Sequence, residues 1–305
     1  MNFDLDQDER ELQRGIRELC AGRFSLRRGG GFDRAFWSDL GEAGVFALMV
    51  PESEGGLGLG MAQAVLVFEE LGRALVPGPL VGTFLGAIGP DRVVGLVERD
   101  APIIEHLESL DQLAVLDDDG IWLVEPSEVT ASPIERPLDP LTPFHRLEEI
   151  PQGELIDSPE AVARWRLEGS VLTAALSAGI AAATVDLAVS YAREREQFGR
   201  PIGSFQAVKH LCADMLVRAE VARAAVHAAG VLLDEESDDV RRAVHAAKLL
   251  ASEAAIANGK TCIQVHGGMG FTWEATPHLY LKRAMVLAAQ FDGVDSHADA
   301  MLAHL

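Results

Sequence analysis

Apolar residues recur at helical spacing through most of the C-terminal half of the chain. Val240, Val244, Ala247 and Ala251 follow one another at intervals of three or four residues, which places them on one face of a helix. The same spacing predicts four consecutive helices, over residues 160–198, 205–234, 238–265 and 277–290. Four long helices with apolar faces predict a C-terminal four-helix bundle over residues 159–305.

The N-terminal pattern is also helical, with turns between the helices. Periodic apolar positions predict helices over residues 4–20, 34–43 and 61–75. In the third of these helices, we expect Glu69 and Glu70 to face solvent or a helix terminus. The pattern therefore predicts an N-terminal helical domain over residues 1–91.

The middle of the chain changes character. Its apolar runs are short and typical of strands, over residues 93–97, 113–116, 121–124 and 129–132. The segment Asp117-Asp-Asp-Gly120 is a hairpin turn signal, and five prolines follow between residues 126 and 143. We predict a small β domain over residues 92–158 inside a mostly α-helical protein.

Composition limits the classes of partner. The 305 residues carry a formal net charge of −21, so nucleic acid and anionic membrane surfaces are disfavoured as partners. An anionic cofactor stays compatible with this charge, because local clusters of arginine and lysine decide its binding. Hydrophobic residues make up 48% of the chain but aromatic residues only 6%, which is typical of helices rich in alanine, leucine and valine.

Cysteine usage and hydropathy indicate a cytoplasmic protein without a metal site. Cys20, Cys212 and Cys262 are odd in number and share no metal-ligand spacing, and a reducing compartment explains them. We interpret His210 and His266 as hydrogen-bonding residues near a cofactor or the core. The N-terminus is acidic and lacks an apolar signal core, and the longest uncharged stretches have 17 residues, short of the roughly 20 that span a bilayer.

The glycine-rich loop Gly55-Gly-Leu-Gly-Leu-Gly60 invites a dinucleotide-binding interpretation. A G-x-G-x-x-G fingerprint would need its last glycine where Met61 or Gln63 stands. No alternation of strands and helices follows the loop. The sequence therefore excludes a Rossmann domain.

A helix corner at residues 191–212 carries the most informative chemistry. Gly199, Pro201 and Gly203 interrupt the helical pattern, and Ser204 is a candidate cap for the next helix. Arg195 and Phe198 precede the break, whereas the first turns of the next helix carry Gln206, Lys209 and His210. Cations, an aromatic ring and helix N-terminal amides suit a cofactor with phosphates and a ring. The same spacing also fits an ordinary helix corner with solvated charges.

Several motifs resemble those of the acyl-CoA dehydrogenase family. They are Arg195-x-x-Phe198-Gly199 followed by Phe205-Gln206, the turn Gln264-Val265-His266-Gly267-Gly268-Met-Gly-Phe271, the segment Gly44 to Gly58, and Phe68-Glu-Glu-Leu-Gly72. They occur in the family's order and cover the first 80 or so residues and nearly everything from residue 165 onward. The resemblance implies an acyl-CoA dehydrogenase-like fold.

The resemblance also implies FAD as cofactor and an acyl-CoA thioester as substrate. Family members remove the proton α to the thioester with a carboxylate base, and the flavin accepts the β-hydrogen. By resemblance, Arg195, Phe198, Gln206 and the run Gln264, Val265, His266, Gly267 and Gly268 contact the adenosine-pyrophosphate half of an FAD held mainly by a neighbouring subunit.

The middle region departs from the family pattern. Family members carry a Thr-Gly loop and a Trp-containing strand that hold the flavin ring, and this sequence has no equivalent. The neighbours of Trp122 do not match that strand, so we interpret Trp122 as a core residue.

The catalytic base departs from the pattern as well. Most of the family has a Tyr-Glu-Gly-Thr run near the C-terminus, and the matching stretch here is Phe291-Asp292-Gly293-Val294. Asp292 thus holds the base position with a side chain that is one methylene shorter. A minority of the family places the base early in the long helix, at a position that corresponds to Gly169, with Glu168 beside it.

The adenosine-side motifs are thus intact, whereas the ring-side motifs and the base are not. This combination resembles the short, degenerate subunit of heterotetrameric acyl-CoA dehydrogenases of bacterial steroid (cholesterol) degradation. It implies a full-length partner subunit in an α2β2 assembly. Two alternatives remain open: a self-sufficient homo-oligomer that uses Asp292 as base, and a scaffold or regulatory relative that binds no flavin.

Overall fold

The computed structural model describes residues 5–24, 31–86, 89 and 92–303. Its α-helices are α1 (Gln7–Arg23), α2 (Arg34–Glu42), α3 (Met61–Ala74), α4 (Leu80–Gly86), α5 (Pro159–Glu194), α6 (Gln206–Asp234), α7 (Val240–His266), α8 (Pro277–Ala289) and α9 (Val294–Ala303). The four helices predicted for the C-terminal half are confirmed as α5 to α8, with their ends shifted by a few residues. The pattern did not predict α4 and α9.

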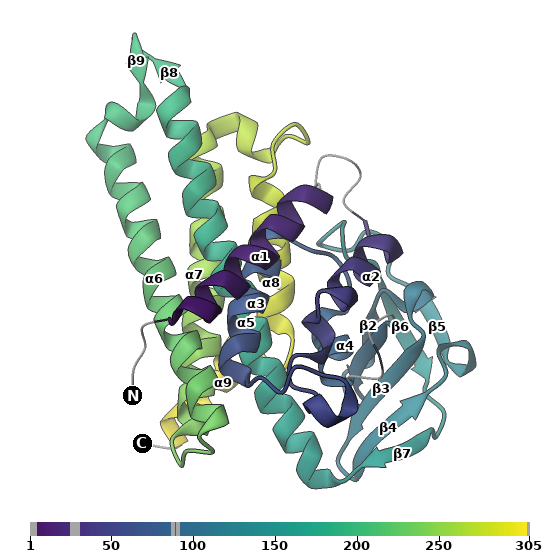
Figure 1. Cartoon of the computed structure of the whole chain (residues 1–305). Coiled ribbons are helices and arrows are strands. Elements are labelled where there is room, and N and C mark those ends of the chain that lie inside the picture. The colour runs from purple at the N-terminus through teal and green to yellow at the C-terminus, as the bar shows by residue number, and fades with distance from the viewer. Residues whose placement is uncertain (1–4, 25–30, 87–88, 90–91, 304–305) are drawn as a thin grey trace. The chain divides into compact units, whose positions relative to one another are not determined.

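The chain forms two compact units. The first comprises residues 1–22, 65–76 and 170–305, and the second comprises residues 23–64 and 77–169. Within the first unit, α5, α6, α7 and α8 run beside one another as a bundle, and α1 and α3 lie against it (Figure 1). The C-terminal four-helix bundle predicted from the sequence is therefore present.

Two glycines allow the backbones of α3 and α5 to touch. A Cβ atom on Gly179 would lie 2.0 Å from the Glu69 carbonyl oxygen, and one on Gly72 would lie 2.1 Å from the Leu176 carbonyl oxygen. Real Cβ atoms do not approach oxygen this closely, so both positions require glycine. Small residues of α5 thus pack against α3 of the same chain.

The expectation that Glu69 and Glu70 face solvent is wrong. Both residues are buried, with exposed fractions of 3% and 1%. Glu70 accepts hydrogen bonds from Nε and Nη2 of Arg17 at 2.8 and 2.6 Å. Glu69 lies 3.0 Å from Nε2 of His227 on α6. The two carboxylates therefore connect α3 to α1 and α6, which satisfies their charge inside the protein.

The second unit contains the predicted β region. Its strands are β1 (Val94–Glu98), β2 (Ile103–Glu105), β3 (Gln112–Asp117), β4 (Gly120–Val124), β5 (Thr130–Pro133), β6 (Phe144–Glu149) and β7 (Glu154–Asp157). They form one sheet in the order β1-β3-β4-β7 and another in the order β2-β6-β5. Asp117 pairs with Gly120, so the hairpin predicted from the turn signal is confirmed.

Trp122 packs on the hydrophobic core of this β region, as the sequence analysis expected. It contacts a cluster that includes Leu113, Val115 and Val124. Its indole Nε1 donates a hydrogen bond to Oδ1 of Asp119 at 2.9 Å. Packing and a local hydrogen bond thus account for this tryptophan.

Helix α5 is the one helix in the described part of the chain whose length and apolar composition would suit a membrane span. Of its most apolar window, 83% is buried inside the protein. Burial to this extent is what a core helix of a bundle shows.

Candidate functional site

The helix corner that the sequence singled out is a tight hairpin between α5 and α6. Strands β8 (Glu196–Gln197) and β9 (Arg200–Pro201) pair antiparallel, and Phe198 and Gly199 form the turn with φ values of 55° and 74°. Positive φ at both central residues is the pattern of a type I′ turn. The sequence analysis expected Ser204 to cap α6, and this expectation is wrong. The N-cap residue is Phe205, and no side chain forms a capping hydrogen bond there.

The side chains at this corner are presented to solvent. Phe198 is 91% exposed, and its ring meets that of Phe205 edge-on at 6.1 Å. The Arg200 guanidinium lies over the Phe205 ring at 4.2 Å. Arg195 is exposed, and no ion pair or hydrogen bond involves its side chain among the described residues. An uncovered ring beside an uncommitted cation is what a site for a bound molecule or a partner chain presents.

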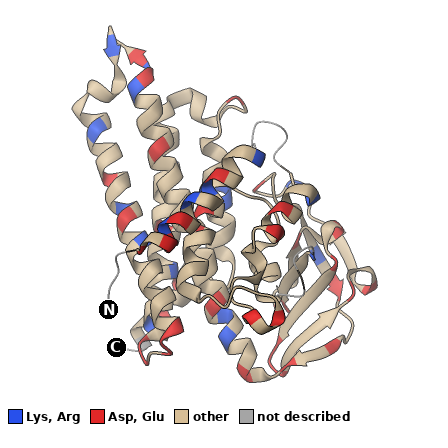
Figure 2. Cartoon of the chain, viewed as in Figure 1, with Lys and Arg blue, Asp and Glu red and all other residues tan. Residues whose placement is uncertain are grey.

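The amides at the start of α6 complete this surface. Gln206 opens the helix and is exposed, as are Lys209 and His210 in its first turn. Figure 2 shows basic residues (blue) among acidic ones (red) at the β8–β9 end of α5 and α6, so the net negative charge of the chain does not exclude cations there. The first amides of a helix also favour an anion.

The glycine-rich turn lies at the end of α7. Gly267 has a φ of 61°, and a Cβ atom on either Gly267 or Gly268 would meet nothing within 4 Å. The backbone of this turn is therefore open to approach from outside. Three residues before it were predicted site residues, and of these Gln264 is exposed, whereas Val265 is 8% exposed and packs in the core.

His266 fixes the turn and joins it to the helix corner. Its Nδ1 donates a hydrogen bond to the Cys262 carbonyl oxygen at 2.8 Å, and burial lowers the pKa of the imidazole. The neutral ring therefore keeps Nε2 as an acceptor. The ring stacks on Tyr191 in the last turn of α5, with centroids 4.2 Å apart. The ends of α5 and α7 thus meet, and both motifs lie at one end of the bundle (Figure 1).

A substitution at Gly268 tests whether this turn binds a ligand, apart from any effect on the stability of the chain. We expect Gly268→Val to leave the thermal unfolding midpoint close to wild type, because the added atoms meet nothing inside the chain. Flavin retention by the assembled protein should fall, because the branched side chain occupies the space through which a ligand approaches the backbone. Flavin absorbance per chain after gel filtration measures this. Normal flavin content would show that the turn only ends a helix.

Asp292 lies far from these motifs along the bundle. It follows α8, whose 13 residues span about 20 Å at 1.5 Å per residue. Figure 1 shows α9, which begins after Asp292, at the other end of the bundle from β8 and β9. Asp292 is exposed, with φ at 70°, and among the described residues it has no hydrogen-bond or ion-pair partner. This chain therefore does not bring Asp292 to the helix corner.

Glu168 lies beside the position of the alternative base and lines a cavity of about 470 Å³ in the second unit. The wall includes Phe46, Met49, Phe84, Arg164 and Trp165. Glu168 is 6% exposed and accepts a hydrogen bond from Nε of Arg164 at 2.7 Å. The sequence noted this carboxylate but not the aromatic wall, which comes from three separate segments.

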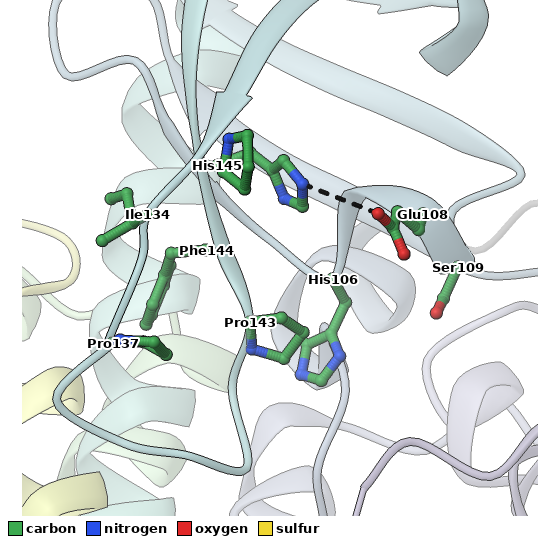
Figure 3. Close-up of a pocket in the computed structure, with 9 residues that line it drawn as sticks. His106, Glu108, Ser109, Ile134, Pro137, Pro143, Phe144 and His145 are labelled. Carbon is green, nitrogen blue, oxygen red and sulfur yellow. Dashed lines mark ion pairs between the residues drawn. The ribbon is translucent and has the colours of Figure 1, made fainter.

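A second cavity, of about 220 Å³, lies in the β region (Figure 3). Prolines, Ile134 and Phe144 form much of its wall, with His106 and His145 among them. Nε2 of His145 lies 3.9 Å from Oε1 of Glu108. Sequence reasoning did not identify this cavity, because its residues share no motif. Across the described residues, no group of three or more His, Cys, Asp or Glu is placed to hold a metal ion.

Comparison with known proteins agrees with this geometry. Residues 6–89 match the N-terminal domain of acyl-CoA dehydrogenases, and residues 161–295 match the acyl-CoA dehydrogenase C-terminal domain. The chain is 35% identical to the acyl-CoA dehydrogenase IpdE2 of Mycobacterium tuberculosis over 280 residues, which cover 87% of this chain and 85% of IpdE2. The chain therefore belongs to the acyl-CoA dehydrogenase family.

Two further matches are a longer protein and a complex of two proteins. Acyl-CoA dehydrogenase FadE34 of Mycobacterium tuberculosis is 38% identical over 282 residues, which cover 82% of this chain but only 39% of FadE34. The solved ChsE4-ChsE5 complex from the same organism matches with a TM-score of 0.85 at 20% identity, over 100% of this chain and 98% of the matched chain. At that identity, the structural match shows the fold alone.

Proposed function

We propose that this chain is a subunit of an FAD-dependent acyl-CoA dehydrogenase and that it contributes the adenosine-pyrophosphate side of the FAD site to a full-length partner subunit. The substrate is a CoA thioester, with a steroid-derived acyl group as the specific candidate. The assembly is an α2β2 heterotetramer with one FAD per heterodimer, in the cytoplasm.

One observation carries this proposal. The chain presents an exposed aromatic and cationic corner and an open glycine turn at one end of its bundle, about 20 Å along the bundle from its own Asp292. A site built on this corner is therefore completed by another chain. The β region has no Thr-Gly loop or Trp-containing strand that resembles those of the family, which supports a different chain as the one that holds the flavin ring.

The relatives support a partner of this kind. FadE34 is more than twice as long as the segment that matches this chain, which leaves room for a second segment of similar size in one polypeptide. The ChsE4-ChsE5 complex pairs two different proteins. Both cases are consistent with this chain as one half of a pair.

The residues at the corner fit a dinucleotide cofactor. Arg195 would pair with the pyrophosphate, the amides at Gln206 would add hydrogen bonds, and Phe198 would cover an apolar face of the ligand. The turn at Gly267 and Gly268 would let the ligand approach the backbone, with Nε2 of His266 as an acceptor nearby. When bound, FAD supplies the acceptor for the β-hydrogen.

Co-expression with a full-length acyl-CoA dehydrogenase subunit tests the proposal directly. We expect this chain alone to purify without flavin and the complex to purify yellow, with a mass of two copies of each chain and two FAD. Native mass spectrometry and flavin absorbance give both numbers. A homo-oligomer of this chain with one FAD per chain would contradict the proposal and support the self-sufficient alternative. A complex that never holds flavin would support the scaffold alternative.

The proposed heteromer and the self-sufficient alternative also differ in which chain supplies the catalytic base. We expect Asp292→Asn to leave most of the turnover of the complex, because the side chain is one methylene short and lies on a subunit without flavin-ring residues. A displacement near 1 Å costs on the order of 10²-fold in rate, which already makes Asp292 a poor base. Turnover of a CoA thioester with an artificial electron acceptor measures this. A loss of about a thousandfold at full flavin occupancy would identify Asp292 as catalytic.

A further inference from the structure

Lys248 on α7 is a fully buried amine inside the bundle. Its exposed fraction is 0%. Nζ donates hydrogen bonds to Oγ1 of Thr173 on α5 at 2.9 Å and to the Leu287 carbonyl oxygen in the last turn of α8 at 2.6 Å. Lysine is almost never fully buried without a close anionic partner, and none of the described carboxylates forms an ion pair with it. An apolar side chain would fill this space without the cost of burying an amine.

The contacts of this amine match its uncharged form. A neutral amine has two N–H groups, and Nζ has two acceptors, whereas an ammonium group would leave a third N–H buried without one. Burial lowers the pKa of Lys248 to about 7, and the negative charge of Asp292 acts in the opposite direction. The amine is therefore close to its titration point at neutral pH.

Two histidines hold the turn that follows α8. Nε2 of His297 donates a hydrogen bond to the Phe291 carbonyl oxygen at 2.7 Å, and its backbone N–H bonds to the Gly293 carbonyl oxygen at 3.2 Å. Nδ1 of the neutral ring is then an acceptor, and Nδ1 of His245 donates to it at 2.8 Å. The pKa of His297 is lowered, first by burial and also by the neighbouring Lys248.

One strained segment follows the end of α8 that Lys248 holds. Phe291 and Asp292 both have positive φ, at 52° and 70°, a conformation that residues with a Cβ rarely adopt. Lys248 holds the last turn of α8 just before this segment through the Leu287 carbonyl oxygen, and His297 holds Phe291 within it. A strained turn persists only where its surroundings hold it in place.

We propose that Lys248 is the positioning residue of the Phe291–Asp292 turn, that it holds the end of α8 with an uncharged amine, and that its protonation is coupled to the charge of Asp292. The groups that titrate around it are Asp292 in the turn, His297 on α9 and His245 on α7. The coupling is a property of this chain by itself. Its effect on catalysis rests on the function proposed above.

Titration of the full chain labelled with ¹³C-lysine tests the coupling. The Lys248 resonance is the one that Lys248→Met removes. We expect it to titrate near neutral pH in the wild type, and at a lower pH in Asp292→Asn, because the neutral amide no longer favours the charged amine. Asp295→Asn, a nearby change at the start of α9, is the matched control and should leave the titration unchanged. A Lys248 titration that is the same in Asp292→Asn and wild type would overturn the proposal.

Hydrogen exchange tests the positioning. Lys248→Met should raise the exchange rate of the amides at residues 290–293 by about tenfold, because the loss of one hydrogen bond worth about 1.4 kcal/mol changes an equilibrium by that factor. The control is Lys260→Met, on an exposed face of the same helix, which should leave these exchange rates unchanged. Unchanged exchange in Lys248→Met would contradict the positioning role. Thr173→Val removes only one acceptor and serves if Lys248→Met does not fold.

A pH profile of the co-expressed complex tests whether the turn takes part in turnover. Because Asp292 is not the base in the function proposed above, Lys248→Met and Lys260→Met should both leave the pH dependence of turnover as in wild type. If the complex holds no flavin while the titration and exchange results appear as expected, the proposed function fails and the positioning role stands. A changed pH profile for Lys248→Met alone would contradict the expectation that the partner subunit supplies the base.

Discussion

Replacement of Gly179 by alanine is expected to destabilise the helical bundle strongly. Its Cβ atom would lie 2.0 Å from the Glu69 carbonyl oxygen and 2.8 Å from the Arg73 backbone nitrogen. Neither backbone atom can move without displacing α3 from α5. We expect a loss of about 3 kcal/mol, the upper end for overpacked sites. For a chain of 305 residues this corresponds to a fall in the unfolding midpoint of about 5 °C.

The matched control is Gly15→Ala on α1, where the new Cβ atom would meet nothing within 4 Å. This change should leave stability unchanged or raise it by up to about 1 kcal/mol, because alanine is the better helix former. Thermal unfolding followed by circular dichroism compares the two variants. Equal midpoints for Gly179→Ala and wild type would show that α3 and α5 do not pack as closely as described.

Replacement of Arg195 by alanine is expected to have the largest effect on cofactor binding. The guanidinium is exposed and has no ion-pair or hydrogen-bond partner among the described residues, and Arg195 precedes Phe198 by three residues in the hairpin that leads into α6. A hydrogen bond to a charged group contributes about 1.5–3 kcal/mol, so the flavin dissociation constant of the complex should rise about 10- to 150-fold. Fluorescence titration of the flavin-stripped complex with FAD measures this constant.

Arg193→Ala provides the comparison for Arg195→Ala. Arg193 is also exposed in the last turn of α5 and carries the same charge, so it controls for the loss of net positive charge. Flavin affinity should stay close to wild type in this variant, and both variants should unfold at the wild-type midpoint. If the two substitutions weaken FAD binding equally, the helix corner acts only through its overall charge, and a specific contact from Arg195 is excluded.

Much of the helical framework was predictable from the sequence because its signals are local. Periodic apolar residues identified α5 to α8, and the Asp117–Gly120 turn identified the hairpin. Helix α4 was missed because glycine occurs twice in its seven residues. The structure explains one of them: a Cβ atom on Gly82 would lie 2.6 Å from the Val94 carbonyl oxygen, so the helix needs glycine to approach β1.

Strands β2 and β6 were missed for a different reason. Ile103–Glu105 pairs with Phe144–Arg146 across a long stretch of chain, and neither segment alternates clearly. Partners so distant in sequence leave no local pattern, since each strand is defined by the other. The division of the chain into domains at residues 91 and 158 stays a prediction.

The sequence by itself determined the helical framework, the hairpin turn and the order of the family motifs, because periodicity, turn residues and spacing are properties of neighbouring positions. Only the tertiary structure decided which polar groups are buried. Glu69, Glu70 and Lys248 look like surface residues in the sequence, and each becomes buried because a helix from elsewhere in the chain packs over it. The distance between Asp292 and the helix corner was likewise set by the antiparallel course of α8, which no local pattern records.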